Sequence, residues 1–205
     1  VSQGNWQILY DVAGQLNQGR LDDPRLPHPV ADIRASFWCR NSGIELQNLY
    51  ATMGPTMIQV ATAKRHGWTP DAPFSLEATL LNLQIDPAFL PLLPAVVQNE
   101  WPKYFPEGVA NVQVHVSSDG RQVDLRVTAD VKDASFAYHK FPYRLQGVTG
   151  RLELTPERLT IRLTARAGEQ SVDIRGEVLT PLVAPRCQIS ISGQGIALDN
   201  RLTDA

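Results

Sequence analysis

The segment FPYRLQGVTGRLELTPERLTIRL, residues 141–163, alternates apolar with polar residues and is interrupted twice by turn sequences. Alternation of this kind is typical of β-strands that have one apolar and one hydrated face. The segment LPHPVADIRASFWCRNSGIELQN, residues 26–48, has the same spacing of apolar residues but shares few residue identities with it. Three pairs of residues give an offset of 115 positions: Pro27 and Pro142, Phe37 and Leu152, and Leu46 and Ile161.

The composition is that of a folded globular protein. Of its 205 residues, 43% are hydrophobic and 20% charged, and Pro and Gly are spread along the chain rather than pooled in a linker. A net charge of −2 and a pI near 6.1 give no electrostatic case for nucleic acid as a partner. No apolar run reaches the length of a membrane-spanning helix, and the start has no signal-peptide pattern. We interpret the chain as a fragment of a longer protein.

Period-two alternation covers most of the chain and predicts an antiparallel meander. Turn residues separate the strands at Asp119-Gly120, Pro156-Glu157 and Gly168-Glu169. Residues 64–73 are predicted to form a loop. The apolar positions of the first half are Ile8, Tyr10, Val12, Ile33, Ala35, Phe37, Cys39, Ile44, Leu46, Met57, Phe74, Leu76 and Ala78.

Residues 86–108 break the alternation and predict a helical plug. Asp86 is a good N-cap, and Pro87 suits the first helical position. Prolines within the segment should split it into short pieces. Its apolar residues recur at helical spacing and are expected to face β residues: Phe89, Leu93, Val97 and Trp101.

The offset of 115 extends along the chain without a gap until residue 198, and "LDNRL" at 198–202 then resembles the start of the plug. We therefore expect a mainly β fold, a curved, groove-like antiparallel sheet built from two repeats of about 115 residues. Residues 1–85 would be the first β repeat and 86–108 the plug. Residues 109–205 would be the second β repeat, running into the start of a second plug.

Several stretches resemble the AsmA/TamB-like superfamily of bacterial envelope proteins, which are repeating β-groove, bridge-like lipid transfer proteins. They are DASFAYHKFPYRLQGVTGRLELTPERLTIR at 133–162, GEQSVDIRGEV at 168–178, ISGQGIALDNRL at 191–202, and a Trp followed by FPEG at 101–108. The likeness covers most of the chain and is clearer after residue 84, whereas residues 40–72 depart most from it. Its motifs consist of spacing and small residues and contain no invariant chemical group.

The resemblance implies a folded sheet with an apolar inner groove, in a periplasmic fragment of a protein anchored in the inner membrane. It implies phospholipid acyl chains as the cargo carried between inner and outer membranes, and envelope proteins of either membrane as further partners. Contact with a membrane would be made only through parts missing from this chain.

The sequence offers no catalytic constellation, so we expect no enzyme activity, no cofactor and no metal. The histidines are scattered, and His115, between two valines, should point to the hydrated face. Cys39 and Cys187 lie in strand-like runs and are interpreted as small buried hydrophobes, although a disulfide stays open. The arginines of the second half are expected on a solvated outer face or at the groove rim.

Two functions fit the alternation equally well. In the first, inward residues line a groove that shelters acyl chains. In the second, the same residues close on each other in a structural or protein-binding β-sandwich of outer-membrane biogenesis. The residues expected on the inner face are Val112, Val114, Val116, Val123, Leu125, Val127, Leu152, Leu154, Leu159, Ile161, Leu163, Val172 and Ile174.

Overall fold

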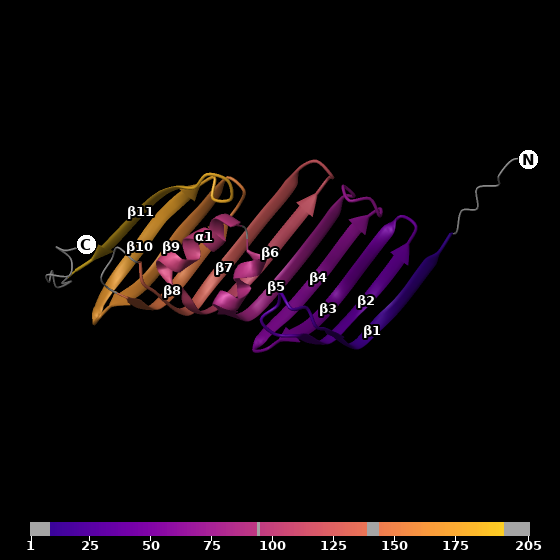
Figure 1. The fold of residues 1–205 in the computed structure, drawn as a ribbon, viewed down its shortest axis with the longest axis horizontal. Helices are drawn as coiled ribbons and strands as arrows, with labels where there is room; N and C mark the ends of the chain where they lie inside the picture. The colour runs from indigo at the N-terminus through magenta and orange to yellow at the C-terminus, as the bar shows by residue number, and fades with distance from the viewer. Residues whose placement is uncertain (1–8, 94, 139–143, 195–205) are drawn as a thin grey trace, which may run out of the picture.

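The computed structural model describes residues 9–93, 95–138 and 144–194, and its strands form one sheet of eleven antiparallel strands in sequence order (Figure 1). The prediction of a mainly β, antiparallel meander is confirmed. The strands are β1 (Asp11–Leu21), β2 (Val30–Arg40), β3 (Gly43–Met53), β4 (Thr56–His66), β5 (Phe74–Ile85), β6 (Glu107–Ser118), β7 (Val123–Phe136), β8 (Leu145–Leu154), β9 (Arg158–Ala167), β10 (Gln170–Leu179) and β11 (Arg186–Gly193). The predicted loop at 64–73 is shorter than expected, because β4 continues to His66.

The pairing of β1 with β2 recurs in the pairing of β7 with β8. Three pairs of the first hairpin are Leu16↔Ala35, Gly19↔Ile33 and Leu21↔Val30. Their counterparts in the second are Val131↔Gly150, Ala134↔Val148 and Phe136↔Leu145, and each residue follows its counterpart by 115 positions. Both hairpins therefore share the same two register shifts.

The offset does not persist without a gap. The β3–β4 turn closes on Met53↔Thr56, whereas the β9–β10 turn closes on Ala167↔Gln170, an offset of 114. β3 contains Asn48 with a positive φ of 51°, and β9 contains no such residue. The expected start of a second plug, at 198–202, lies outside the described residues.

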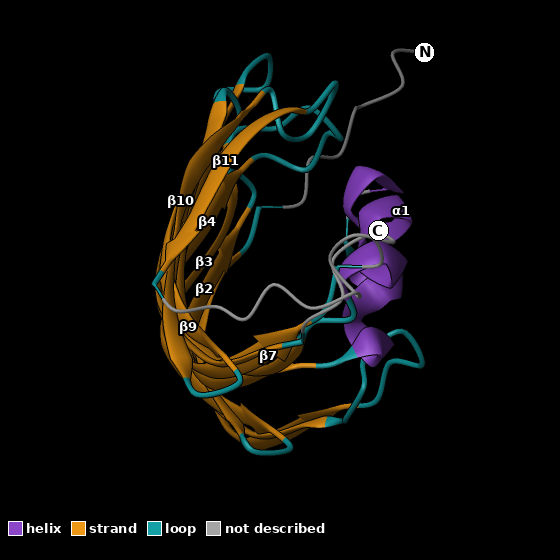
Figure 2. Cartoon of the chain, turned by 90° about the vertical axis from the view of Figure 1, so that its left-hand side faces the viewer, coloured by secondary structure: helices purple, strands orange, loops and turns teal. Residues whose placement is uncertain are grey.

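The sheet is curved about an axis that runs across its strands, as Figure 2 shows in a view along the sheet. Register shifts interrupt most pairings from β1 to β9, whereas the pairings of β9, β10 and β11 have none. Several residues with positive φ lie at or beside these shifts, among them Asp32 and Gly147, which are 115 positions apart. Such bulges bend a strand and increase its twist, so they account for the curvature.

A cluster of buried apolar residues lies on β7 to β10, and it includes the fully buried Leu145, Val148 and Val172. This cluster comprises Val131, Leu145, Val148, Ala165, Ala167, Val172 and Ile174. The described residues form no second sheet against which it could pack. The core therefore lies within the fold of one sheet, between residues of its own inner face.

The segment between β5 and β6 forms two short helices. A 3-10 helix, η1 (Pro87–Leu92), begins after Asp86, whose side chain accepts a hydrogen bond of 2.7 Å from the Ala88 amide. The helix α1 (Ala95–Tyr104) follows, so the predicted N-cap and the division into short pieces are confirmed. Both helices lie on the concave side of the sheet (Figures 1 and 2). The described residues of η1 and α1 include no buried side chain.

We expect Leu145→Ala to lower the free energy of unfolding by about 2–4 kcal/mol, because the Leu145 side chain is 1% exposed and its removal leaves a cavity. Leu179→Ala is the matched control, since Leu179 is 40% exposed, and it should cost under about 1 kcal/mol. Urea unfolding followed by circular dichroism measures both. Equal losses of unfolding free energy in the two variants would contradict the placement of Leu145 in the core.

Trp101→Ala should lower the free energy of unfolding by only about 1–2 kcal/mol, well short of the loss from a fully buried Trp, because the ring is half-buried on α1. The far-ultraviolet spectrum of the sheet should stay unchanged. A loss as large as that of Leu145→Ala would show that α1 is an integral part of the core.

Candidate binding groove

The inner face of the sheet is built from rows of paired residues. Residues that pair across antiparallel strands point to the same side of the sheet. One row runs Leu49, Val60, Ala78, Val114, Val127, Leu154, Leu159, Val178 and Cys187. The next runs Ala51, Ile58, Leu80, Val112, Ala129, Leu152, Ile161, Gly176 and Ile189. Apolar side chains thus form two rows from β3 to β11, of which the second is interrupted at Gly176.

All the residues expected on the inner face lie on this one side. Val114, Val127, Leu154 and Leu159 belong to the first row, and Val112, Leu152 and Ile161 to the second. The rest share the face by direct pairing or by alternation along their strands: Val116, Val123, Leu125, Leu163, Val172 and Ile174. Period-two alternation alone was enough to place them together.

Their accessibility differs with position. Val172 and Ile174 are buried in the cluster at the bend, and Val123 is exposed at the end of β7. The others are half-buried, so their side chains retain a free surface. An inner face that is apolar and incompletely covered can bind an apolar ligand, because contact removes further surface from water.

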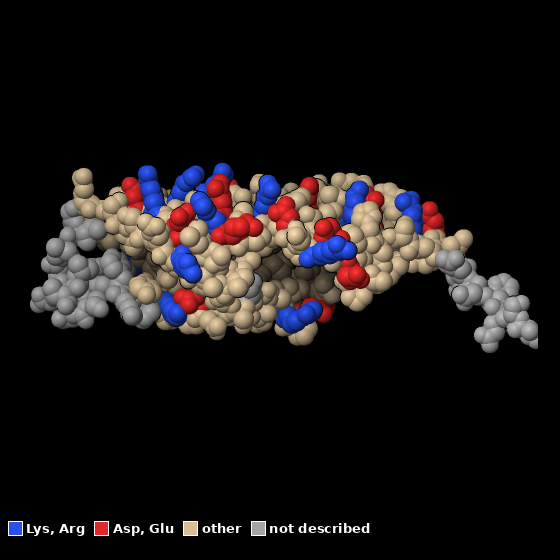
Figure 3. All heavy atoms as spheres, turned by 90° about the horizontal axis from the view of Figure 1, so that it is seen from above, with Lys and Arg blue, Asp and Glu red and all other residues tan. Residues whose placement is uncertain are grey.

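Charged residues line the outer, convex side of the sheet. Figure 3 shows Lys, Arg, Asp and Glu along one long side of the molecule, beside a hollow lined by other residues. Cross-strand ion pairs join neighbouring strands there, such as Arg151–Asp130 at 2.8 Å and Lys64–Glu45 at 2.9 Å. These pairs are partly exposed, and each contributes little to stability.

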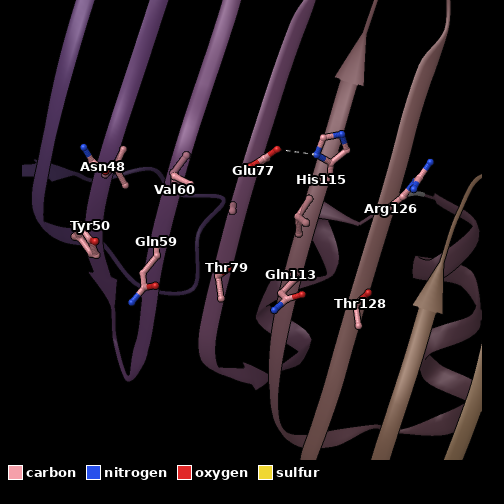
Figure 4. Close-up of a pocket in the computed structure, with 14 residues that line it drawn as sticks. Asn48, Tyr50, Gln59, Val60, Glu77, Thr79, Gln113, His115, Arg126 and Thr128 are labelled. Atoms are coloured by element: carbon pink, nitrogen blue, oxygen red, sulfur yellow. Dashed lines mark ion pairs between the residues drawn. The ribbon is translucent and has the colours of Figure 1, made fainter.

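The outer face also has a shallow depression of about 410 Å³. Figure 4 looks onto it with α1 behind the sheet, and Gln59, Thr79, Gln113 and Thr128 point outward from successive strands. His115 lies at its edge, on the hydrated face as expected, with Nδ1 3.4 Å from a Glu77 carboxylate oxygen. The side chains of this depression are those of an ordinary solvated sheet face.

The end of α1 contacts the two residues that follow β7. The Tyr104 carbonyl accepts a hydrogen bond of 2.8 Å from the Ala137 amide, and the rings of Tyr104 and Tyr138 stack with centroids 5.1 Å apart. Burial raises the pKa of the Tyr104 phenol, and the nearby Tyr138 and Cys187 raise it further. Since Cys187 belongs to β11, this end of α1 lies over the second half of the inner face.

A smaller cavity of about 280 Å³ lies where the helical segment leaves the sheet. Phe89 of η1 shares it with Met53, Ile85 and Gly108, so this plug residue faces β residues as expected. The cavity also contains His28 and Asp86, but no described group of three His, Cys, Asp or Glu side chains could hold a metal ion.

The interpretation of both cysteines as buried hydrophobes is wrong for Cys187. Cys39 is half-buried and Cys187 is exposed, and both thiols are free. Cys187 lies on β11, at the edge of the sheet, where no further described strand covers it. Alternation predicted the face of the residue, but strand order determines whether that face is covered.

Neither the bulges nor the edge positions of β1 and β11 follow from the alternation of apolar and polar residues. The positive-φ residues Gln18, Asp32, Asn48 and Asn82 are polar residues in strands, and only their residue types hinted at left-handed backbone. No helix among the described residues is long and apolar enough to cross a membrane. No protein-family model, curated protein or solved structure matches the chain.

We expect Cys187 to react with a maleimide faster than Cys39, because the first is exposed and the second half-buried. Labelling with substoichiometric reagent, followed by peptide mass spectrometry, measures the ratio. The variants Cys39→Ser and Cys187→Ser each retain one cysteine, so the labelling rate of each thiol can be measured separately. Equal rates would show that the inner face at β11 is covered in solution.

Proposed function

We propose that this chain is a non-enzymatic module whose apolar groove carries phospholipid acyl chains between the inner and outer membranes, as the resemblance to AsmA/TamB-like proteins implies. The module would work in the periplasm, as part of a protein anchored in the inner membrane. The observation that carries the proposal is the set of apolar rows that cross a single curved sheet from β3 to β11.

The size of the groove supports an acyl chain as ligand. Eleven strands at a spacing of about 4.8 Å give a sheet about 48 Å across. Half of a bilayer's hydrocarbon core is about 15 Å thick, so a whole acyl chain would fit along the rows. Each methylene kept from water contributes about 0.8 kcal/mol, and the described parts of the two rows present no charged group that would stop a chain from sliding.

We also propose that the sheet consists of two copies of one unit. The shared register shifts of the β1–β2 and β7–β8 hairpins support this duplication, because chance alternation does not reproduce bulge positions. In this proposal the two copies conserve the alternation of apolar and polar positions rather than the residue identities, since the alternation alone determines which face of the sheet is apolar. The helical segment would cap the groove where the two copies meet.

The alternative function, a β-sandwich module, requires a second apolar layer. The described residues contribute one sheet, and most side chains of its two inner rows are half-buried. The groove therefore fits these residues better than a sandwich does.

We expect Leu125→Asp and Ile161→Asp to weaken binding of a fluorescent phospholipid by about tenfold or more, because an unpaired carboxylate among acyl chains is strongly unfavourable. Arg126→Asp and Arg162→Asp are matched controls, since each lies one residue further along the same strand on the outer face. Titration with lipid, after circular dichroism has shown that each variant folds, measures the difference.

Photo-crosslinking tests the same groove without a change of charge. A photoreactive amino acid at position 125 or 161 should capture phospholipid, and one at 126 or 162 should not. Mass spectrometry identifies the adducts. Equal capture from both faces, or no capture from either, would leave the lipid groove without support.

A further inference from the structure

Among the described residues, no strand pairs with the outer edge of the edge strand β11. All of its residues are exposed, whereas residues of its neighbour β10 include Ile174 at 3% exposure. On the inner face, Ile189 and Ile191 are 43% and 48% exposed, although they continue the apolar rows of the groove. β11 thus combines an unpaired backbone edge with uncovered apolar side chains.

β11 also has none of the features that usually protect a free edge. Natural edge strands carry bulges, prolines, lysines or inward charges that prevent pairing with another chain. β11 pairs with β10 without a register shift, and it contains no proline and no lysine. Its one charged residue is Arg186, at its first position.

The opposite edge differs. β1 has two register shifts against β2, and Gln18 has a positive φ of 59°. It also carries Asp11 at its first position and Arg20 at its last but one. A bulged, charged strand does not offer a regular row of backbone partners, so the two edges of the sheet are not equivalent.

The molecule itself shows which kind of strand covers such an edge. β11 is the fifth strand of the second half, as β5 is of the first, and the outer edge of β5 is paired with β6. There Leu76, Ala78 and Leu80 are opposite Val116, Val114 and Val112. Small β-branched residues at every second position of an antiparallel strand are therefore what covers the inner side chains of β5.

We propose that β11 is an acceptor for one antiparallel strand of a partner polypeptide whose inward positions are small β-branched residues, as in β6. Main-chain hydrogen bonds to β11 would supply affinity, and packing on Ile189 and Ile191 would select the alternating sequence. The groove would then continue onto the added strand. This inference concerns polypeptide binding and holds whether or not the groove carries lipid.

The test uses a labelled peptide with the sequence of residues 107–118, EGVANVQVHVSS, and a control peptide of the same composition in which the valines no longer alternate. Fluorescence anisotropy against the whole chain should show saturable binding of the first peptide and at least roughly tenfold weaker binding of the second. Maleimide labelling of Cys187 should slow as the first peptide saturates, because the added strand covers β11.

Two protein variants localise the binding. Ile191→Lys places a charge on the inner face of β11 and should weaken peptide binding by about tenfold, whereas Val12→Lys, on the inner face of β1, should leave it unchanged. Circular dichroism shows that both variants fold, and hydrogen exchange should show added protection in β11 alone.

Three results would overturn the proposal: no saturable binding up to about 1 mM peptide, equal binding of both peptides, or equal loss in both variants. Dimerisation of the free protein that Ile191→Lys abolishes would also overturn it, since the edge would then belong to a second copy of the chain. None of these measurements involves lipid, so they leave the proposed groove function to its own test.

Discussion

Backbone pairing between successive antiparallel strands is the interaction on which this molecule depends. Each pair puts two side chains on the same face, so a row that is apolar in one strand must be apolar in the next. The row from Leu49 to Cys187 keeps this phase across nine strands. A slip of one residue in any hairpin would turn all later rows toward water, so every turn helps to maintain the inner face.

Curvature of the single sheet buries apolar side chains here, whereas in most β proteins a second packed layer buries them. The bulges near Asp32 and Gly147 bend the sheet, and side chains from neighbouring parts of its inner face then bury one another. Leu145 and Val148, next to the second bulge, are each 1% exposed. Away from this cluster most residues of the two inner rows remain half-buried, although Ala51, Val60 and Val178 are buried. Most of the tightly packed residues and most of the accessible apolar surface therefore occupy different parts of one face.

Much of this fold could be predicted from residue patterns, and the rest depended on tertiary geometry. Leu152 and Ile161 were placed correctly because alternation determines a face, and Asp86 because its side chain caps a backbone amide. Asn48 hinted at left-handed backbone by its residue type alone, and residue type does not show that a strand continues through a bulge. Cys187 was assigned to the interior because composition cannot reveal that its strand lies at an edge. The half-burial of α1 likewise depends on how far the sheet bends.

The sequence order of the strands has a consequence for folding. Every strand is bonded only to strands that precede or follow it directly, so the hairpins are closed by short loops, except where the helices separate β5 from β6. Contacts of low sequence separation close early and at small entropic cost. Folding can therefore begin at several hairpins and spread by addition of one strand at a time, as in solenoid proteins. The helical segment, between Ile85 and Glu107, is the longest of these connections, so pairing of β5 with β6 closes the largest loop and carries the largest cost in closure entropy.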